Sequence, residues 1–209
     1  MVQKRIMIIN YGMGNIGSVA NALRTLQSDY FVSGRREDLR QADAYILPGV
    51  GAFPAAMENL RKLDLIGELT EQTLTRGKPL LGICLGMQLL AESSVEQGFS
   101  EGLGWIRGHV VKLEPRDGLR IPHVGWNNVS FSRSDFLFRN IDGSPHFYFD
   151  HSYHLQCAEE IISATCDYGG TWVAGVQKKN IFATQFHPEK SQRNGLKLLR
   201  NYLNFVEAR

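Results

Sequence analysis

The sequence predicts an α/β fold, in which a largely parallel, helix-covered central sheet carries an antiparallel mixed extension. In the first half of the chain, short apolar runs alternate with segments of helical periodicity, an order typical of parallel sheets covered on both faces. In the second half, strand-like segments follow one another across Asp-Gly and Gly-Gly turns, which favours antiparallel pairing. The 209 residues suffice for one hydrophobic core, and we expect a single domain over residues 1–209.

The expected elements of the first half follow from apolar spacing. Apolar residues three and four positions apart, such as Ile16, Val19, Ala20 and Leu23, indicate a helix, whereas short continuous apolar runs indicate buried strands. Strands are expected at residues 5–10, 30–33, 44–49 and 79–84, and helices at residues 15–26, 54–76 and 87–94.

The second half is rich in expected strands and closes with an amphipathic helix. The β-branched and aromatic residues of these segments are typical of strands. Strands are expected within residues 109–113, 123–131, 146–155, 161–169 and 171–187, and the closing helix at residues 194–206.

Composition excludes several classes of function. The hydrophobic share of 43% and the charged share of 21% are typical of globular proteins in water, and a net charge of +2 provides no strong field for nucleic acid. The apolar run at residues 6–9 is too short for a signal peptide or a membrane span. Three widely spaced cysteines without a CxxC motif favour reduced thiols, and so a cytoplasmic protein.

The segment "GMGNIG", residues 12–17, has the glycine spacing of a dinucleotide-binding turn. A chain of this length leaves little room for a separate substrate domain, and no segment resembles a hydride-transfer site. We therefore interpret these glycines as a tight turn between a strand and a helix, and expect no cofactor.

Cys84 lies in "LLGICLG", between Gly82 and Gly86, at the corner between an expected strand and an expected helix. Two interpretations are open here. Cysteine is often a small buried core residue. The pattern Gly-x-Cys-x-Gly also resembles a nucleophile elbow, in which the helix dipole favours a thiolate and the N–H of Leu85 faces an oxyanion.

The segment "TQFHPEKS" places His187 and Glu189 two residues apart at the end of an apolar strand. A catalytic thiol needs a base, and the base needs a carboxylate that fixes its tautomer. Residues two apart on a strand can face the same way. A lone histidine at a strand end is usually a surface residue, but its combination with the Cys84 corner favours nucleophilic catalysis.

Several motifs together resemble the class I (triad) glutamine amidotransferases. "GICLGMQ" and "FHPEKS" are typical of the whole family. A narrower set, "YGMGN", "LPGVGAF", "PHVGWN" and "HSY", is similar to the glutaminase subunits of imidazole glycerol phosphate synthases, which act in histidine biosynthesis. The resemblance runs from about residue 10 to the end of the chain. It implies an enzyme that hydrolyses L-glutamine to glutamate and ammonia without a metal or an organic cofactor.

The resemblance also assigns roles, position by position. Cys84 is expected to be the nucleophile, His187 the acid and base, and Glu189 the residue that orients the imidazole. The remaining expected site residues are Gly49, Val50, Gly51 and Leu85 for the oxyanion, and Gln88, His151, Ser152 and Tyr153 for the substrate.

A heterodimer with a cyclase subunit, a (β/α)8 barrel that takes up the ammonia, is likewise implied. Because glycines flank Val50, a flip of its peptide is cheap, and partner docking could align one oxyanion donor that contributes roughly 2.7–4 kcal/mol. The expected contact residues are Asn10, Tyr11, Gly12, Met13, Asn15, Pro122, Trp126 and Lys190.

Two residues depart from the family pattern. Asp150 stands before "HSY" where an apolar residue is usual, and His154 follows it where an aromatic one is common. We expect Asp150 to lie solvated on an outward strand face. The spacing of His151, His154 and Cys157 alternates between strand faces, so no metal site is expected, and Cys157 and Cys166 are interpreted as packing residues.

Three alternatives stay open. A paralogous subunit could supply ammonia for the amination of a nucleotide sugar in surface polysaccharide synthesis, an alternative kept because of Asp150 and the short segment 133–142. A non-enzyme alternative is an inactive scaffold that only binds its partner, although such a relic has no reason to keep Cys84, His187 and Glu189. An esterase or peptidase fits Gln88 and the "PGVG" loop poorly.

Overall fold

The structure, a computed structural model, describes residues 4–114, 116, 118–131 and 136–209. Its helices are α1 Ile16–Thr25, α2 Phe53–Lys62, α3 Leu65–Thr70, α4 Leu85–Gln88 and α5 Gln192–Glu207, with shorter turns η1 Arg36–Arg40, η2 Glu71–Thr75, η3 Phe136–Phe138, η4 Glu159–Ile161 and η5 Pro188–Lys190. Its strands are β1 Ile6–Ile9, β2 Tyr30–Ser33, β3 Ala44–Gly49, β4 Leu80–Cys84, β5 Ala91–Ser94, β6 Ser100–Glu101, β7 Ile106–Lys112, β8 His123–Asn128, β9 Ser130–Phe131, β10 His146–His151, β11 Tyr153–Cys157, β12 Ile162–Asp167, β13 Thr171–Lys178 and β14 Ile181–Thr184.

The central sheet of the described residues has eight strands in the order β2-β1-β3-β4-β14-β13-β12-β9. The five strands β2, β1, β3, β4 and β14 run parallel, and β13, β12 and β9 continue the sheet antiparallel. The predicted fold class, a largely parallel sheet with an antiparallel extension, is confirmed. The carboxyl ends of β3, β4 and β14 therefore lie side by side, which brings "PGVG", Cys84 and "QFHPE" to one edge.

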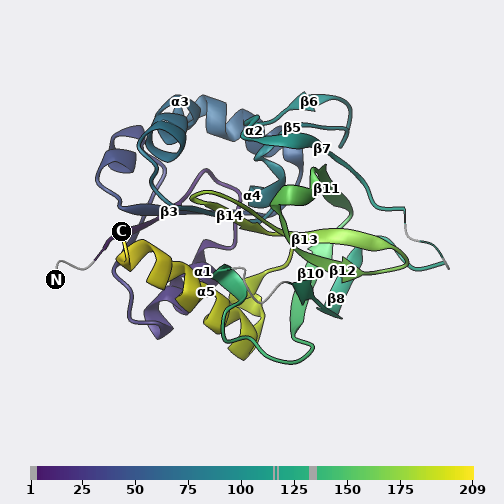
Figure 1. Ribbon diagram of the computed structural model, residues 1–209. Helices are drawn as coiled ribbons and strands as arrows, with labels where there is room; N and C mark the ends of the chain where they lie inside the picture. The colour runs from purple at the N-terminus through teal and green to yellow at the C-terminus, as the bar shows by residue number, and fades with distance from the viewer. Residues whose placement is uncertain (1–3, 115, 117, 132–135) are drawn as a thin grey trace.

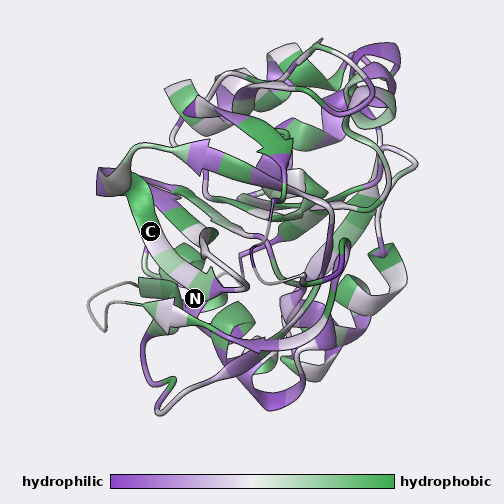
Figure 2. Cartoon of the chain, turned by 90° about the vertical axis from the view of Figure 1, so that its right-hand side faces the viewer, coloured by the Kyte–Doolittle hydropathy of each residue, from purple (hydrophilic) through white to green (hydrophobic). Residues whose placement is uncertain are grey.

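Helices cover both faces of this sheet: α2 and α3 lie on one face, and α1 and α5 on the other (Figure 1). Alternation along β1 explains the two layers, because successive strand residues point to opposite faces. Ile6 and Ile8 pack in the cluster that includes residues of α1 and α5, whereas Met7 and Ile9 pack in the cluster that includes residues of α2 and α3. The helices alternate between hydrophobic and hydrophilic residues (Figure 2), as one-sided packing requires.

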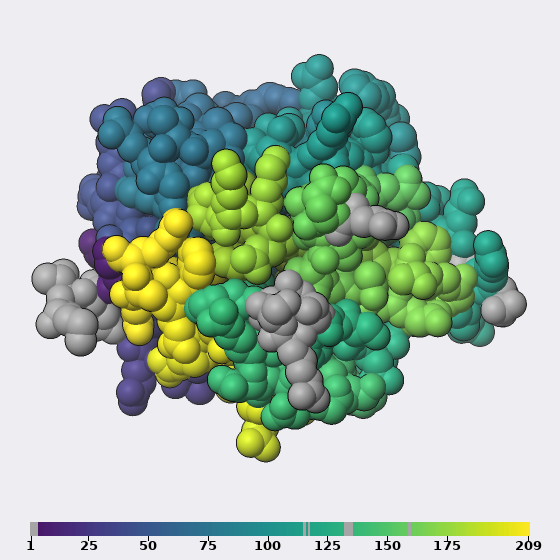
Figure 3. Space-filling model, in the orientation of Figure 1, coloured from purple at the N-terminus to yellow at the C-terminus, as the bar shows by residue number. Residues whose placement is uncertain are grey.

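Two smaller sheets complete the described part. One pairs β8 with β10, and the other has the order β11-β7-β5-β6. The predicted strands at 123–131 and 146–155 are each divided between sheets: β9 joins the central sheet while β8 does not, and β11 leaves β10 for β7. Helix α5 lies on the surface beside η3 (Figure 3), where Asn201 donates to the carbonyls of Leu137 and Arg139.

The helix predicted at residues 87–94 is wrong over most of its length. Helix α4 ends at Gln88, and Ala91–Ser94 form β5, which pairs in parallel with β7 and antiparallel with β6. These partners lie further along the chain, so the local apolar run, which fits a helix, does not reveal them. The predicted helix at 54–76 is broken at Asp64, whose backbone is left-handed at φ 51°.

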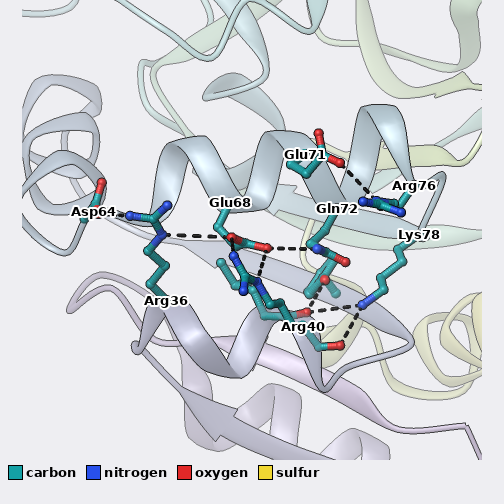
Figure 4. Close-up of polar contacts among 10 residues, drawn as sticks. Arg36, Arg40, Asp64, Glu68, Glu71, Gln72, Arg76 and Lys78 are labelled. Carbon is teal, nitrogen blue, oxygen red and sulfur yellow. Dashed lines mark hydrogen bonds and ion pairs between the residues drawn. The ribbon is translucent and has the colours of Figure 1, made fainter.

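Glu68 on α3 holds η1 against this helical layer (Figure 4). Its buried carboxylate accepts two hydrogen bonds from Arg40, at 2.9 and 2.8 Å, and one from Gln72 at 2.8 Å. The hydrogen bonds from Arg40 and Gln72 lower the pKa of Glu68 to about 2. Lys78 adds hydrogen bonds to the carbonyls of Leu39 and Arg40.

Residues 133–135 of the segment 133–142, on which one alternative function partly rests, lie outside the described residues. Among the helices that the structure describes, none is long and apolar enough to cross a membrane.

Candidate active site

Cys84 ends β4 in a strained turn. Its backbone has φ 54° and ψ −110°, a left-handed conformation that costs a residue with a side chain about 1–3 kcal/mol. Glycines make the turn feasible: a Cβ on Gly86 would lie 1.9 Å from the carbonyl oxygen of Leu47, and one on Gly82 would lie 2.9 Å from the oxygen of Gly86. The side chain of Cys84 lines a cavity although the residue is only 6% exposed.

His187 and Glu189 form a buried pair beside this turn. His187 Nδ1 and Glu189 Oε1 are 2.8 Å apart, and the two side chains are 2% and 1% exposed. The expected reason for their proximity, alternation along a strand, is wrong, since β14 ends at Thr184 and Glu189 lies in η5. Pro188 begins that turn instead, and the N–H of His187 is held by the carbonyl of Tyr148 at 2.8 Å.

The imidazole of His187 joins the sulfur to the carboxylate. Burial lowers the pKa of His187, but hydrogen bonds with Cys84 and Glu189, together with their negative charges, raise that pKa to about 10. Because Nδ1 faces Glu189, Nε2 is the nitrogen available to Cys84. At neutral pH this arrangement favours an imidazolium beside the sulfur.

A second polar group also faces the sulfur. Gln185 is fully buried, and its Nε2 donates to Cys84 Sγ at 3.7 Å. Helix α4 has only four residues, so the helix dipole that the sequence suggests is weaker than expected. His187 and Gln185 are therefore the side chains positioned to act on the sulfur.

The "PGVG" loop leaves β3 next to the sulfur. Gly49 is the strand neighbour of Cys84, and a Cβ on Gly49 would lie 2.7 Å from Leu85 Cβ and 2.8 Å from the backbone nitrogen of Gly86. Val50 and Gly51 line the cavity, and Gly51 has φ 101°, which favours glycine. The loop and Leu85 therefore line the same cavity.

The cavity has a volume of about 260 Å³ and collects the predicted substrate residues. Gln88 donates to the Tyr153 carbonyl at 2.8 Å and to Gln185 Oε1 at 3.0 Å, so its Oε1 is the atom left for a substrate. The cavity is lined by Val50, Gly51, Cys84, Leu85, Gln88, Glu96, Pro122, Asp150, His151, Ser152, Tyr153 and His187.

Sequence reasoning missed Glu96 and Gln185. Glu96 follows β5, two residues beyond the helix predicted at 87–94, and its Oε2 accepts a hydrogen bond from the N–H of Phe53 at 2.8 Å. Gln185 directly precedes "FHPE", and its place one residue beyond β14 was the available signal.

Asp150 and His154 have different surroundings. The side chain of Asp150 is exposed, as expected, but it also lines the cavity, and its carbonyl oxygen lies 3.8 Å from Cys84 Sγ. His154 is buried against Trp172, with ring centroids 4.5 Å apart. Burial raises the pKa of Cys157 to about 11 and that of Cys166 to about 12, so both thiols stay protonated at neutral pH.

Most of the expected contact residues are accessible. Asn10, Gly12 and Pro122 are exposed, Trp126 is 47% exposed, and Met13, Asn15 and Lys190 are half-buried. The contact role expected for Tyr11 is wrong. Tyr11 is 1% exposed, because its side chain packs into the core with the hydroxyl close to Gly49, so the side chain cannot contact a partner there.

A family model confirms the class of protein. The glutamine amidotransferase class-I model matches residues 7–205, and the chain belongs to this family of enzymes. The predicted membership is thereby confirmed.

The curated relatives indicate which kind of glutamine amidotransferase this chain is similar to. The chain is 49% identical to imidazole glycerol phosphate synthase subunit HisH 1 of Campylobacter jejuni subsp. jejuni serotype O:23/36 (strain 81-176), covering 94% of this chain and 98% of that protein. It is 49% identical to subunit HisH 2 of Vibrio vulnificus (strain YJ016), covering 97% and 95%, and 44% identical to subunit HisH of Bacillus cereus (strain B4264), covering 97% and 96%. The predicted similarity to these subunits is confirmed.

Solved structures agree on the fold. PurLQS from Thermotoga maritima matches with a TM-score of 0.76 at 20% identity, covering 98% of this chain and 100% of that one. The glutaminase domain of Trypanosoma brucei CTPS with bound acivicin matches with a TM-score of 0.60 at 18% identity, covering 97% and 94%.

Proposed function

We propose that this chain is the glutaminase subunit of a cytoplasmic imidazole glycerol phosphate synthase, and that Cys84, His187 and Glu189 hydrolyse L-glutamine. The observation that carries the proposal is the convergence of three groups at one edge of the sheet: Cys84 and His187 line the same cavity, and the Glu189 carboxylate lies 2.8 Å from His187 Nδ1. The likeness to HisH subunits over nearly the whole chain supports the histidine-pathway role.

The first half of the reaction forms a thioester. The Cys84 thiolate attacks the side-chain carbonyl of glutamine, and the N–H of Leu85 together with one from the "PGVG" loop stabilises the oxyanion. His187 Nε2 gives its proton to the departing nitrogen, so that ammonia leaves and a γ-glutamyl thioester remains.

The second half restores the enzyme. The now neutral His187 takes a proton from water, the resulting hydroxide attacks the thioester, and Cys84 leaves as a thiolate. Glutamate is released, and the imidazolium–thiolate pair is formed again. Glu189 keeps Nε2 pointed at the sulfur throughout, because it binds Nδ1.

The cavity suits a free amino acid better than a peptide or an ester. Its volume of about 260 Å³ falls below the range typical of larger ligands, which weakens the esterase and peptidase alternative. Glu96 and Asp150 both line it, and a carboxylate there can bind the α-ammonium of glutamine. Residues 151–153 also line the cavity, and their backbone groups can hold the α-carboxylate.

The partner is a separate (β/α)8 cyclase subunit, which receives the ammonia before bulk water can protonate it. We assign its docking face to the exposed apolar side chains beside the cavity, supplemented by Lys190, whose Nζ lies 5.2 Å from the ring centroid of Tyr148. The docking face consists of Leu119, Ile121, Pro122, Val124, Trp126 and Lys190. Exposed apolar patches of this kind commonly mark interfaces.

The experiment measures glutamate release by the wild type and by Cys84→Ala, each with and without the co-expressed barrel subunit. The expected result is that the wild type releases glutamate and Cys84→Ala does not, although Cys84→Ala still binds the partner. Equal release from both proteins would refute the proposal, and no release from either would favour the inactive scaffold. Conversion of the histidine-pathway ribonucleotide by the complex distinguishes this acceptor from a nucleotide sugar.

A further inference from the structure

A pair of buried histidines connects the docking face with the cavity. His123, the first residue of β8, is 3% exposed, and His151, the last residue of β10, is 6% exposed. His123 Nδ1 and His151 Nε2 are 3.2 Å apart. The chemistry proposed for the site uses His187 as its only imidazole, so this pair has no part in the reaction itself.

The partners at either end fix the proton on each ring. The side-chain amide of Asn127 donates to the Asp167 carbonyl at 2.8 Å and to His123 Nε2 at 3.3 Å. His123 therefore carries its proton on Nδ1 and donates it to His151 Nε2, and His151 donates from Nδ1 to the Tyr153 carbonyl at 2.9 Å. Burial lowers the pKa of His123 to about 4 and that of His151 to about 3, which agrees with two neutral rings.

The same carbonyl continues the connection to the sulfur. The Tyr153 oxygen also accepts from Gln88 Nε2, Gln88 donates its second hydrogen to Gln185 Oε1, and Gln185 donates to Cys84 Sγ. We call this set the imidazole–amide chain; its side chains are Asn127, His123, His151, Gln88, Gln185 and Cys84.

The β8 end of the imidazole–amide chain is coupled to the docking face. The ring of His123 is stacked on Phe149 and on Tyr168, with centroid distances of 4.7 and 4.0 Å. Val124 and Trp126 of the same strand are exposed and belong to the docking face. A shift of β8 on docking therefore moves His123, and His151 must follow or lose its hydrogen bond.

We propose that the imidazole–amide chain links partner docking at β8 to the position of the catalytic sulfur, with His123 and His151 as positioning residues. The inference rests on the proposed function, because it requires a partner that docks on β8. Packed hydrogen-bond networks of this kind change coupling between sites by about 2- to 30-fold when interrupted.

The test interrupts the imidazole–amide chain without disturbing the stacking of the ring at position 123 on Phe149 and Tyr168. His123→Phe keeps a planar ring on Phe149 and Tyr168 but removes both nitrogens. The matched control is Tyr168→Phe, which keeps the same stack and removes only a hydroxyl that donates to the Arg120 carbonyl, outside the chain. Asn127→Ala is the second interruption, at a half-buried position where folding is more tolerant.

Glutamate release is measured for each complex with the barrel subunit and for each free chain. In the His123→Phe and Asn127→Ala complexes, kcat falls by about 2- to 30-fold and the stimulation by the partner falls with it. KM for glutamine and the dissociation constant of the partner stay unchanged, because His123 and Asn127 belong to neither the cavity lining nor the docking face. Loss of folding alone would not produce this division between kcat and KM.

Each other outcome overturns the inference. If the partner stimulates glutamate release as strongly in Asn127→Ala as in the wild type, and in His123→Phe if that variant folds, the imidazole–amide chain does not couple docking to the sulfur. An equal loss in Tyr168→Phe, which keeps both the ring stack and the imidazole–amide chain, would show that the effect does not depend on the imidazole–amide chain. Absence of glutamate release from the wild-type complex would remove the proposed function itself, and this result is distinct from the other two.

Discussion

Replacing Glu189 with glutamine tests how the carboxylate supports His187. The change keeps the shape of a side chain that is 1% exposed and removes the charge 2.8 Å from Nδ1. Loss of one charged hydrogen bond costs about 1.5–3 kcal/mol, which corresponds to a 10- to 150-fold lower kcat/KM for glutamate release.

The orientation of the new amide adds a second effect. If its NH₂ group donates to Nδ1, the imidazole proton lies on Nε2, and the ring cannot accept a proton from the thiol. A wrong tautomer of this kind lowers kcat by about 10⁴-fold in the serine-protease triad, so the loss in Glu189→Gln lies between about 10- and 10⁴-fold.

The assay measures kcat/KM for glutamate release from pH 6 to 9, together with the rate at which iodoacetamide alkylates Cys84. Removing the carboxylate lowers the pKa of His187, so alkylation in the variant shifts to higher pH. Asp150→Asn is the matched control for the alkylation rate only, since it removes a carboxylate of the cavity lining whose part in substrate binding can itself change kcat/KM. Wild-type values of both rates in Glu189→Gln would refute the role assigned to Glu189.

Three further predictions use other parts of the molecule. Gly86→Ala lowers the free energy of unfolding by about 3 kcal/mol or more, because a Cβ there would lie 1.9 Å from the Leu47 carbonyl oxygen. Gly67→Ala stabilises the protein, because Gly67 faces open space on α3. Urea titration of both variants checks these two expectations. The pKa of Glu68 is lowered in the folded state to about 2, so its ion pair with Arg40 stabilises the protein above pH about 4.3 and ceases to do so as pH falls towards 2. The urea midpoints of wild type and Glu68→Gln should therefore differ at pH 7 and converge on acidification. A difference that stays constant with pH would argue against the ion pair. Iodoacetamide at pH 7 should label Cys84 at least about 100-fold faster than Cys157 or Cys166, whose pKa values are raised by burial; comparable labelling by peptide mass spectrometry would contradict this.

The central layer of the fold could be predicted because its signals are local. The strands predicted at residues 30–33 and 44–49 have the same bounds in the structure, as β2 and β3. Both are bounded by turn residues and are too short to be helices. The glycines around Cys84 likewise indicate a sharp turn from the sequence alone, and the structure shows which backbone clash each of them avoids.

The parts that sequence reasoning missed depend on distant partners. Strand β5 exists because β7 and β6 pair with it. The resemblance implies a contact role for Tyr11 together with its neighbours in "YGMGN", but the side chain of Tyr11 turns into the core. Three contacts of the imidazole–amide chain, His123–His151, Gln88–Gln185 and Gln185–Cys84, join residues 28, 97 and 101 positions apart, and no periodicity reports such contacts.

The most direct test of the reaction traps its intermediate. The complex is incubated with glutamine, quenched with acid and digested, and the peptide that contains Cys84 is analysed by mass spectrometry. A γ-glutamyl adduct on Cys84, with no glutamate release from Cys84→Ala, is the predicted result. Glutamate release from Cys84→Ala at the wild-type rate would contradict the role of this thiol.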